Sequence, residues 1–132
     1  MTGLVGQHYG LAVTDVVLVR AFNNDVYRVV TDEQSYALKI YGLGRFTADE
    51  VRWEQALARH LVNAGLHIAA DVRLADGDTV GVLAAPEGAR PFALTEWVPG
   101  AKPEPPWTDE LFNAVGAALA RFHNAAGTFV TS

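Results

Sequence analysis

The stretch Tyr36-Ala37-Leu38-Lys39-Ile40-Tyr41 decides the fold, because it places a charged lysine near the end of a short apolar run. Apolar runs of this length, with aromatic and β-branched residues, are typical of β-strands. The segment from Thr47 to Ala64 that follows has the pattern of a helix, and Glu54 lies within it. A strand lysine followed by a helix glutamate is therefore the first pair of side chains to consider.

The helix predicted over 47–64 has recognisable ends. Thr47 suits the N-cap position, Asp49 and Glu50 place negative charge in the first turn, and Gly65 follows the last turn. At about 100° per residue, one face of this helix is apolar. Its apolar members are Val51, Leu57, Ala58 and Leu61.

Glu54 projects from the middle of that apolar face. A carboxylate on a buried face is costly unless a cation neutralises it, and Lys39 is the nearest candidate along the chain. Two alternatives stay open. Glu54 could reach only a solvated rim, or Glu50, which shares the face, could be the partner of Lys39 instead.

Composition narrows the function further. The chain has 132 residues, half of them hydrophobic, with 15 acidic against 10 basic residues and a net charge of −5. The sequence has no cluster of Lys and Arg, so nucleic acid and anionic membranes are not expected partners. It has no cysteine, no apolar run long enough to span a membrane and no signal-peptide pattern, and we expect a cytoplasmic protein.

The remaining segments predict an α+β fold. Turn signals around Asn24, Gln34 and Gly88 join short β-prone runs into hairpins, which implies a five-stranded antiparallel sheet with one covering helix. A second helix, Thr108 to Ala125, follows a proline-rich linker, and Leu4 to Leu11 could be a short helix or a turn. The expected strands are Val16–Phe22, Val26–Val30, Ser35–Tyr41, Thr79–Ala84 and Phe92–Val98. The expected organisation is a lobe over 1–98, a linker over 99–107 and a helical segment over 108–132.

Two further segments are candidates for ligand contacts. The turn Asn23-Asn24-Asp25 could offer backbone N–H groups to an anion, or it could be a simple hairpin turn. The segment Leu94 to Gly100 could present backbone groups to a ligand, or it could be an edge strand that ends at a proline. The four histidines have no metal-ligand spacing and fit surface or helix-end positions better.

In order and spacing, these segments resemble the N-terminal lobe of the aminoglycoside phosphotransferase and choline kinase-like family, closest to its homoserine-kinase-like and stress-response-kinase-like members. The resemblance spans about residues 16–123. The segments that carry it are Asn24-Asp25-Val26-Tyr27-Arg28-Val29, Tyr36 to Tyr41, Glu54 with Leu57 and Leu61, Leu94-Thr95-Glu96-Trp97-Val98-Pro99-Gly100, and Leu119-Ala120-Arg121-Phe122-His123.

The resemblance implies an ATP site. Lys39 would bind the ATP phosphates, Glu54 would orient Lys39, and the turn with Asn24 and Asp25 would lie over the phosphates. Glu96, Trp97 and Val98 would contact adenine through their backbone. A kinase-like module kept only for binding or assembly, and an unrelated α+β domain, are the alternatives.

The sequence departs from this family in one respect. The family places its catalytic aspartate in a His-Gly-Asp-type loop, followed by metal-binding residues, and no such motif occurs here. We therefore expect no catalytic residue in this chain, no turnover by the chain alone, and Mg²⁺ binding only with the missing C-lobe. The helix 108–125 carries an apolar stripe that would contact that lobe or a second copy in a homodimer. The stripe is Phe112, Val115, Leu119 and Phe122.

Overall fold

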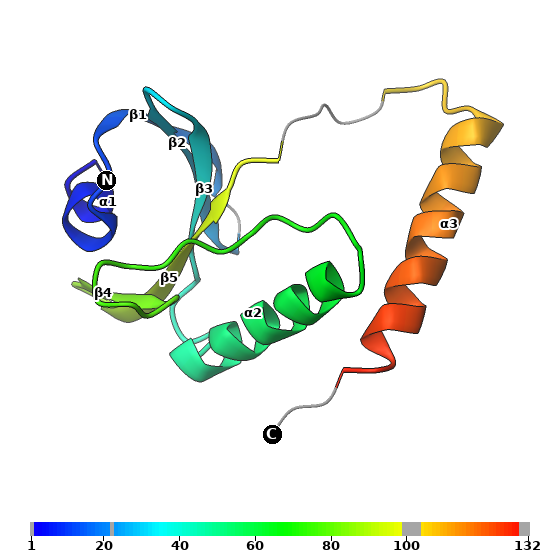
Figure 1. Ribbon diagram of the computed structural model, residues 1–132. Helices are drawn as coiled ribbons and strands as arrows, with labels where there is room; N and C mark the ends of the chain where they lie inside the picture. Colours follow the sequence, from blue (N-terminus) through cyan, green and yellow to red (C-terminus); the bar gives the residue numbers. More distant parts are fainter. Residues whose placement is uncertain (1, 22, 99–103, 130–132) are drawn as a thin grey trace. The chain divides into compact units, whose positions relative to one another are not determined.

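A computed structural model describes residues 2–21, 23–98 and 104–129 (Figure 1). The predicted α+β class and the five-stranded antiparallel sheet are confirmed. The elements follow one another as α1 (Thr2–Tyr9), β1 (Val13–Ala21), β2 (Asp25–Thr31), β3 (Ser35–Ile40), α2 (Ala48–Asn63), β4 (Gly81–Ala85), β5 (Gly88–Glu96) and α3 (Asp109–Ala126).

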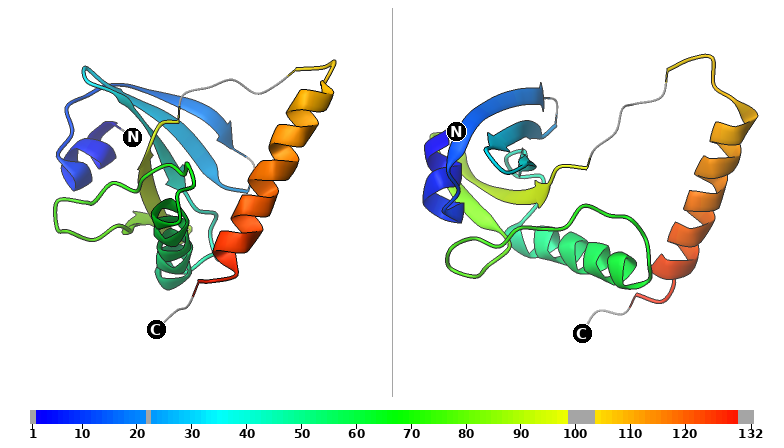
Figure 2. Two further views of the ribbon diagram at one scale, coloured as in Figure 1. Left: turned by 45° about the vertical axis from the view of Figure 1, so that its right-hand side comes forward. Right: turned by 45° about the horizontal axis from the view of Figure 1, so that its top comes forward.

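The sheet has the strand order β1-β2-β3-β5-β4, and every neighbouring pair is antiparallel. The register between β1 and β2 shifts twice, the second time between Leu18 and Arg20. Such irregularities bend a strand and increase its twist. Figure 2 shows β1 and β2 as a curved ribbon in both views.

The strand boundaries differ most from the prediction at the first strand and at the last hairpin, and by one or two residues elsewhere. The first strand begins at Val13, three residues earlier than expected, and its predicted end at Phe22 lies outside the described residues. The last hairpin is tighter than expected, because Ala85 pairs with Gly88 across a two-residue turn. Gly88 has φ 135, a conformation open mainly to glycine, so β5 starts four residues before the predicted Phe92.

The core of the sheet is apolar and well buried. Val29, Leu38, Phe92 and Leu94 are each 0% exposed and belong to one cluster. The segment that could have been a helix or a turn is helix α1, and its Val5 is also fully buried in that cluster. Burying a side chain of this size contributes about 1.5–3 kcal/mol, so α1 is an integral part of the fold.

Helix α2 begins with the predicted cap. Thr47 and Glu50 form a reciprocal capping box, with the Glu50 N–H donating to Thr47 Oγ1 at 3.1 Å and the Thr47 N–H donating to Glu50 Oε1 at 3.2 Å. Val51 and Leu61 are buried, as predicted for this face, whereas Leu57 is half-buried.

Side chains on α2 also fix the first half of the helix to the segment before β4. The Arg52 guanidinium donates to both carboxylate oxygens of Asp78, at 3.3 and 2.8 Å. One turn further on, Gln55 exchanges two hydrogen bonds with Thr79. These four residues set the rotation of the helix, and hence the position of Glu54 between Arg52 and Gln55.

The chain divides into two compact units: residues 1–55 with 69–97, and residues 56–68 with 98–132. These two units do not coincide with the predicted lobe (1–98), linker (99–107) and helical segment (108–132), so that division stays a prediction. Residues 99–103 of the predicted linker lie outside the described residues. In the second unit, α3 starts at the N-cap Thr108, which accepts a hydrogen bond from the Leu111 N–H. His60 Nε2 lies 2.9 Å from the Ala125 carbonyl oxygen, so this histidine contacts a helix end.

Candidate functional site

A row of three residues crosses the sheet in the first unit. Arg20 pairs with Val26, and Val26 pairs with Lys39, on β1, β2 and β3 respectively. Directly opposite residues in a sheet project from the same face. These three residues, together with Asn23 and Asn24 from the intervening turn, line a pocket of about 270 Å³.

The turn beside this pocket is fixed by hydrogen bonds to the segment after β3. Asn24 Oδ1 accepts a hydrogen bond from the Gly42 N–H at 2.8 Å, and Asn23 Oδ1 accepts one from Arg45 Nη2 at 3.1 Å. A Cβ atom on Gly42 would collide with the Asn23 carbonyl oxygen and the Arg45 side chain. Glycine at position 42 therefore permits the close approach of the two loops.

The polar groups of the pocket share one chemical property. The side-chain oxygens of Asn23 and Asn24 are already used as acceptors, so each amide has its NH₂ group left for a ligand. Arg20 and Lys39 can only donate hydrogen bonds. The pocket therefore offers donors and positive charge, which suits an anion with several oxygen atoms.

Asp25, a predicted site residue, takes part in an ion pair within the fold. Its carboxylate accepts a hydrogen bond from Arg90 Nη2 at 3.3 Å, and the pair is largely buried. Arg90 also donates to the Tyr41 carbonyl oxygen at 2.8 Å. Asp25 thus anchors the start of β2, and the guanidinium of Arg90 offsets its negative charge, which reduces its repulsion of an anion in the pocket.

Lys39 and Glu54 are connected through a tyrosine. The Lys39 ammonium lies 4.7 Å from the centroid of the Tyr41 ring, and the Tyr41 hydroxyl donates to Glu54 Oε2 at 3.1 Å. No ion pair among the described residues joins Lys39 directly to Glu54, and Glu54 is exposed. Glu50, the alternative partner, is occupied by its capping box.

Tyr41 itself is held firmly. It is 5% exposed, its N–H donates to the Pro91 carbonyl oxygen at 2.9 Å, and its ring packs edge-on against Phe46. Burial raises the pKa of its hydroxyl well above the usual value, and the negative charge of Glu54 and the hydrogen bond to it raise the pKa further. The hydroxyl therefore remains a proton donor toward Glu54 across the physiological range.

The segment predicted to contact adenine, Glu96 to Val98, makes backbone hydrogen bonds within the fold. The Glu96 N–H donates to the Ala70 carbonyl oxygen at 2.9 Å, and the Trp97 N–H donates to the Ser35 carbonyl oxygen at 3.1 Å. The Trp97 ring lies under the Arg28 guanidinium, 4.9 Å from the ring centroid. The backbone N–H groups of Glu96 and Trp97 are thus available to a ligand only after a rearrangement. The groups that remain for ligand contacts are the carbonyls of this segment and the Val98 N–H.

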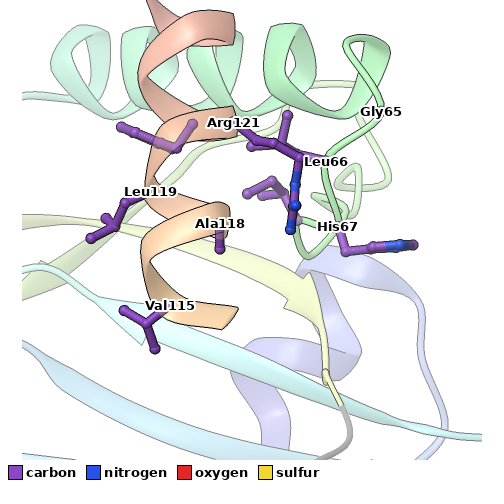
Figure 3. A pocket seen from close by; sticks show the side chains of 9 residues that line it. Gly65, Leu66, His67, Val115, Ala118, Leu119 and Arg121 are labelled. Carbon is purple, nitrogen blue, oxygen red and sulfur yellow. The ribbon is translucent and has the colours of Figure 1, made fainter. Parts of the chain in front are cut away.

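A larger cavity, of about 410 Å³, lies in the second unit between α3 and the segment that follows α2 (Figure 3). Its lining is mostly apolar, and it lacks the converging donors of the smaller pocket. The lining residues are Gly65, Leu66, His67, Ile68, Val115, Ala118, Leu119, Arg121 and Phe122. We therefore assign the candidate site to the smaller pocket, despite its size.

Within 2–21, 23–98 and 104–129, no three His, Cys, Asp or Glu side chains come together as a metal site. Over the same residues, every helix is too short or too polar to cross a membrane.

Sequence reasoning missed Arg20 and Tyr41 as members of this site. Both were visible in the sequence, Arg20 at the end of a β-prone run and Tyr41 two residues after Lys39. Tyr41 shares the strand periodicity of Lys39, which was a usable signal. Arg20 comes next to Lys39 only through the register of three strands, including the irregularity near Leu18.

The chain has a five-stranded antiparallel sheet, a lysine on the third strand that faces the first hairpin turn, and a glutamate on the following helix. This combination defines the N-terminal lobe of a kinase-like protein. Residues 15–131 match the model of the phosphotransferase enzyme family, APH. The chain belongs to this family, as the resemblance indicated.

Individual relatives agree with this assignment. A protein from Deinococcus radiodurans is 36% identical over 98% of this chain, and a homoserine kinase from Nitrobacter winogradskyi is 31% identical over 85%. The structure of the amicoumacin kinase hAmiN, in complex with AMP-PNP, Ca²⁺ and Ami, superposes with a TM-score of 0.87 at 26% identity over 98% of this chain. The chain spans 37%, 32% and 40% of these three proteins, respectively.

Proposed function

We propose that this chain is the ATP-binding lobe of a small-molecule phosphotransferase, a protein that transfers the γ-phosphate of ATP to a hydroxyl acceptor. The observation that carries the proposal is the pocket around Lys39, whose polar side chains have only donors left for a ligand. The complex of hAmiN with AMP-PNP supports it, since that protein binds an ATP analogue and has the same fold over this region.

The residues then take the following roles. Lys39 binds the phosphates as a point charge, and the Asn24 amide donates to them beside the first hairpin. Glu54 orients Lys39 through Tyr41, since it holds the tyrosine whose ring contacts the ammonium. The backbone of Glu96 to Val98 contacts adenine, mainly through its carbonyls and the Val98 N–H.

This pocket does not suit a metal ion. Its donors and positive charges would repel Mg²⁺, and the nearest acidic group, Asp25, is paired with Arg90. We infer that the metal ligands and the catalytic base belong to a second lobe, and that this chain alone transfers no phosphate. ATP, when bound, supplies the transferable phosphoryl group.

Helix α3 offers a surface for the second lobe. The predicted apolar stripe on α3 is solvent-exposed, with side-chain exposures of 60% at Phe112, 49% at Val115, 54% at Leu119 and 38% at Phe122. Exposed apolar surface of this kind marks an interaction site. We infer that the second lobe covers it in a protein of the relatives' length, and that a second copy covers it when the chain is alone.

Calorimetry with ATP in a buffer free of divalent cations tests the proposal. Wild type should bind ATP weakly, and K39Q should bind it about tenfold more weakly, since hydrogen bonds to charged groups contribute about 1.5–3 kcal/mol. R73Q is the control, because it also removes one positive charge. Arg73 donates a hydrogen bond to the Gly77 carbonyl oxygen within its own loop and does not line the pocket. Unchanged ATP affinity in K39Q would refute the site. A second titration with Mg²⁺ added tests the metal inference, because tight binding only in its presence would show metal ligands in this chain.

A further inference from the structure

We propose that Arg20 is a second phosphate-binding residue of this pocket, so that Arg20 and Lys39 together hold a polyphosphate chain without a metal ion. The inference rests on the proposed function, which it deepens. Arg20 and Lys39 stand on either side of Val26 in one row across three strands. Neighbouring strands are about 4.8 Å apart, so the two Cα atoms are separated by roughly 10 Å.

Neither cation has an acidic partner among the described residues. Asp25, next to Val26 on β2, is paired with Arg90, and Glu54 on α2 accepts a hydrogen bond from the Tyr41 hydroxyl. Two positive side chains therefore line one small pocket, and an anion bound between them would lower their mutual repulsion.

The two cations differ in what they can bind. The guanidinium of Arg20 is planar, permanently charged and able to donate two parallel hydrogen bonds to one phosphate group. Lys39 is a compact charge held beside the Tyr41 ring, nearer the middle of the sheet. β1 is an edge strand, so Arg20 lies at the edge of the sheet and is exposed to solvent.

The size and charge of the anion then matter. A single phosphate group carries fewer negative charges and fewer oxygen atoms than a polyphosphate chain, so it compensates the two cations only in part. A chain of two or three phosphates can contact both, with the amides of Asn23 and Asn24 between them. The geometry therefore predicts that affinity increases steeply from orthophosphate to tripolyphosphate, and that Arg20 is responsible for much of the increase.

Nuclear magnetic resonance titrations with inorganic tripolyphosphate and orthophosphate, free of divalent cations and at low ionic strength, test this on the intact chain. R20Q should bind tripolyphosphate about tenfold more weakly than wild type, because it loses hydrogen bonds to a charged group. Its orthophosphate affinity should change less than about threefold, since Lys39 remains. R20K should fall between R20Q and wild type, and R73Q should match wild type.

The outcomes separate this inference from the proposed function. If K39Q weakens tripolyphosphate binding and R20Q does not, the role of Arg20 is wrong and the proposed ATP site stands. If neither substitution weakens binding, the ATP site is wrong as well. An equal loss for orthophosphate and tripolyphosphate in R20Q would overturn the bridging geometry. Arg20 is exposed, so R20Q should fold normally, and circular dichroism checks this.

Discussion

The attachment of α2 to the segment before β4 predicts a measurable dependence of stability on pH. The Asp78 carboxylate accepts two hydrogen bonds from Arg52 and two from the N–H groups of Thr79 and Val80. The Arg52 guanidinium, followed by these backbone bonds, lowers the pKa of Asp78 from 3.8 to about 2. Since α2 carries Glu54, this attachment also supports the candidate site.

The size of the effect follows from the shift. A difference of this size corresponds to about 2.5 kcal/mol of stability if it is fully retained. The side chains of Arg52 and Asp78 are 41% and 38% exposed, so solvent screening reduces the contribution to about 1 kcal/mol.

The sign is fixed by the direction of the shift. Because the pKa of Asp78 is lower in the folded chain, the contribution is complete above the unfolded-state pKa near 4. It is lost as the pH falls through about 2. Acidification over this range should therefore destabilise wild type by about 1 kcal/mol more than D78N, in which the group no longer titrates.

Urea denaturation between about pH 2 and pH 6, followed by circular dichroism, measures this difference. Asparagine keeps an oxygen that can accept from the N–H groups of Thr79 and Val80, so D78N isolates the charge. D76N is the matched control, because within the described part of the chain the Asp76 carboxylate accepts only the Asp78 N–H. If the stabilities of wild type and D78N keep a constant difference over the whole pH range, the assigned coupling between Arg52 and Asp78 is wrong.

Three other predictions concern single contacts. Tyr41→Phe keeps the ring under the lysine but removes the hydroxyl bond to the helix carboxylate, and should lower the free energy of unfolding by about 0.5–1 kcal/mol in urea denaturation. Gly81→Ala should cost about 2–3 kcal/mol, because the added methyl group would overlap the buried Phe92 ring, and an unchanged melting temperature would contradict that packing. The isolated chain should self-associate at high concentration in light scattering, and replacing Leu119 and Phe122 together by serine should abolish this; a monomeric wild type would refute the proposed self-contact.

Local signals in the sequence were sufficient for most of the fold. The start of α2 was predictable because Thr47 and Glu50 form a cap with a defined spacing. The tight last hairpin was not, because the conformation of Gly88 depends on the register that β4 and β5 adopt together. The same limit applied to β1, whose early start at Val13 depends on its pairing with Thr31.

The candidate site was predictable only in part, for the same physical reason. Lys39 and Asn24 could be assigned to one site because the family resemblance implies that both lie at the ATP phosphates. The tyrosine between Lys39 and Glu54 could not, since a sequence pattern gives the face of a side chain and not its distance to a carboxylate. Direct contact between opposite charges was the simplest expectation, and the structure inserts Tyr41 instead.

The two loops that meet at Gly42 have a thermodynamic consequence. Because Asn24 and Asn23 are bonded to Gly42 and Arg45, the rim of the pocket has its shape before any ligand arrives. The conformational entropy of these loops is then lost during folding, and binding incurs little further ordering cost. A substitution at Gly42 would shift that cost to the binding step, so affinity would fall even where every phosphate-contacting side chain remained in place.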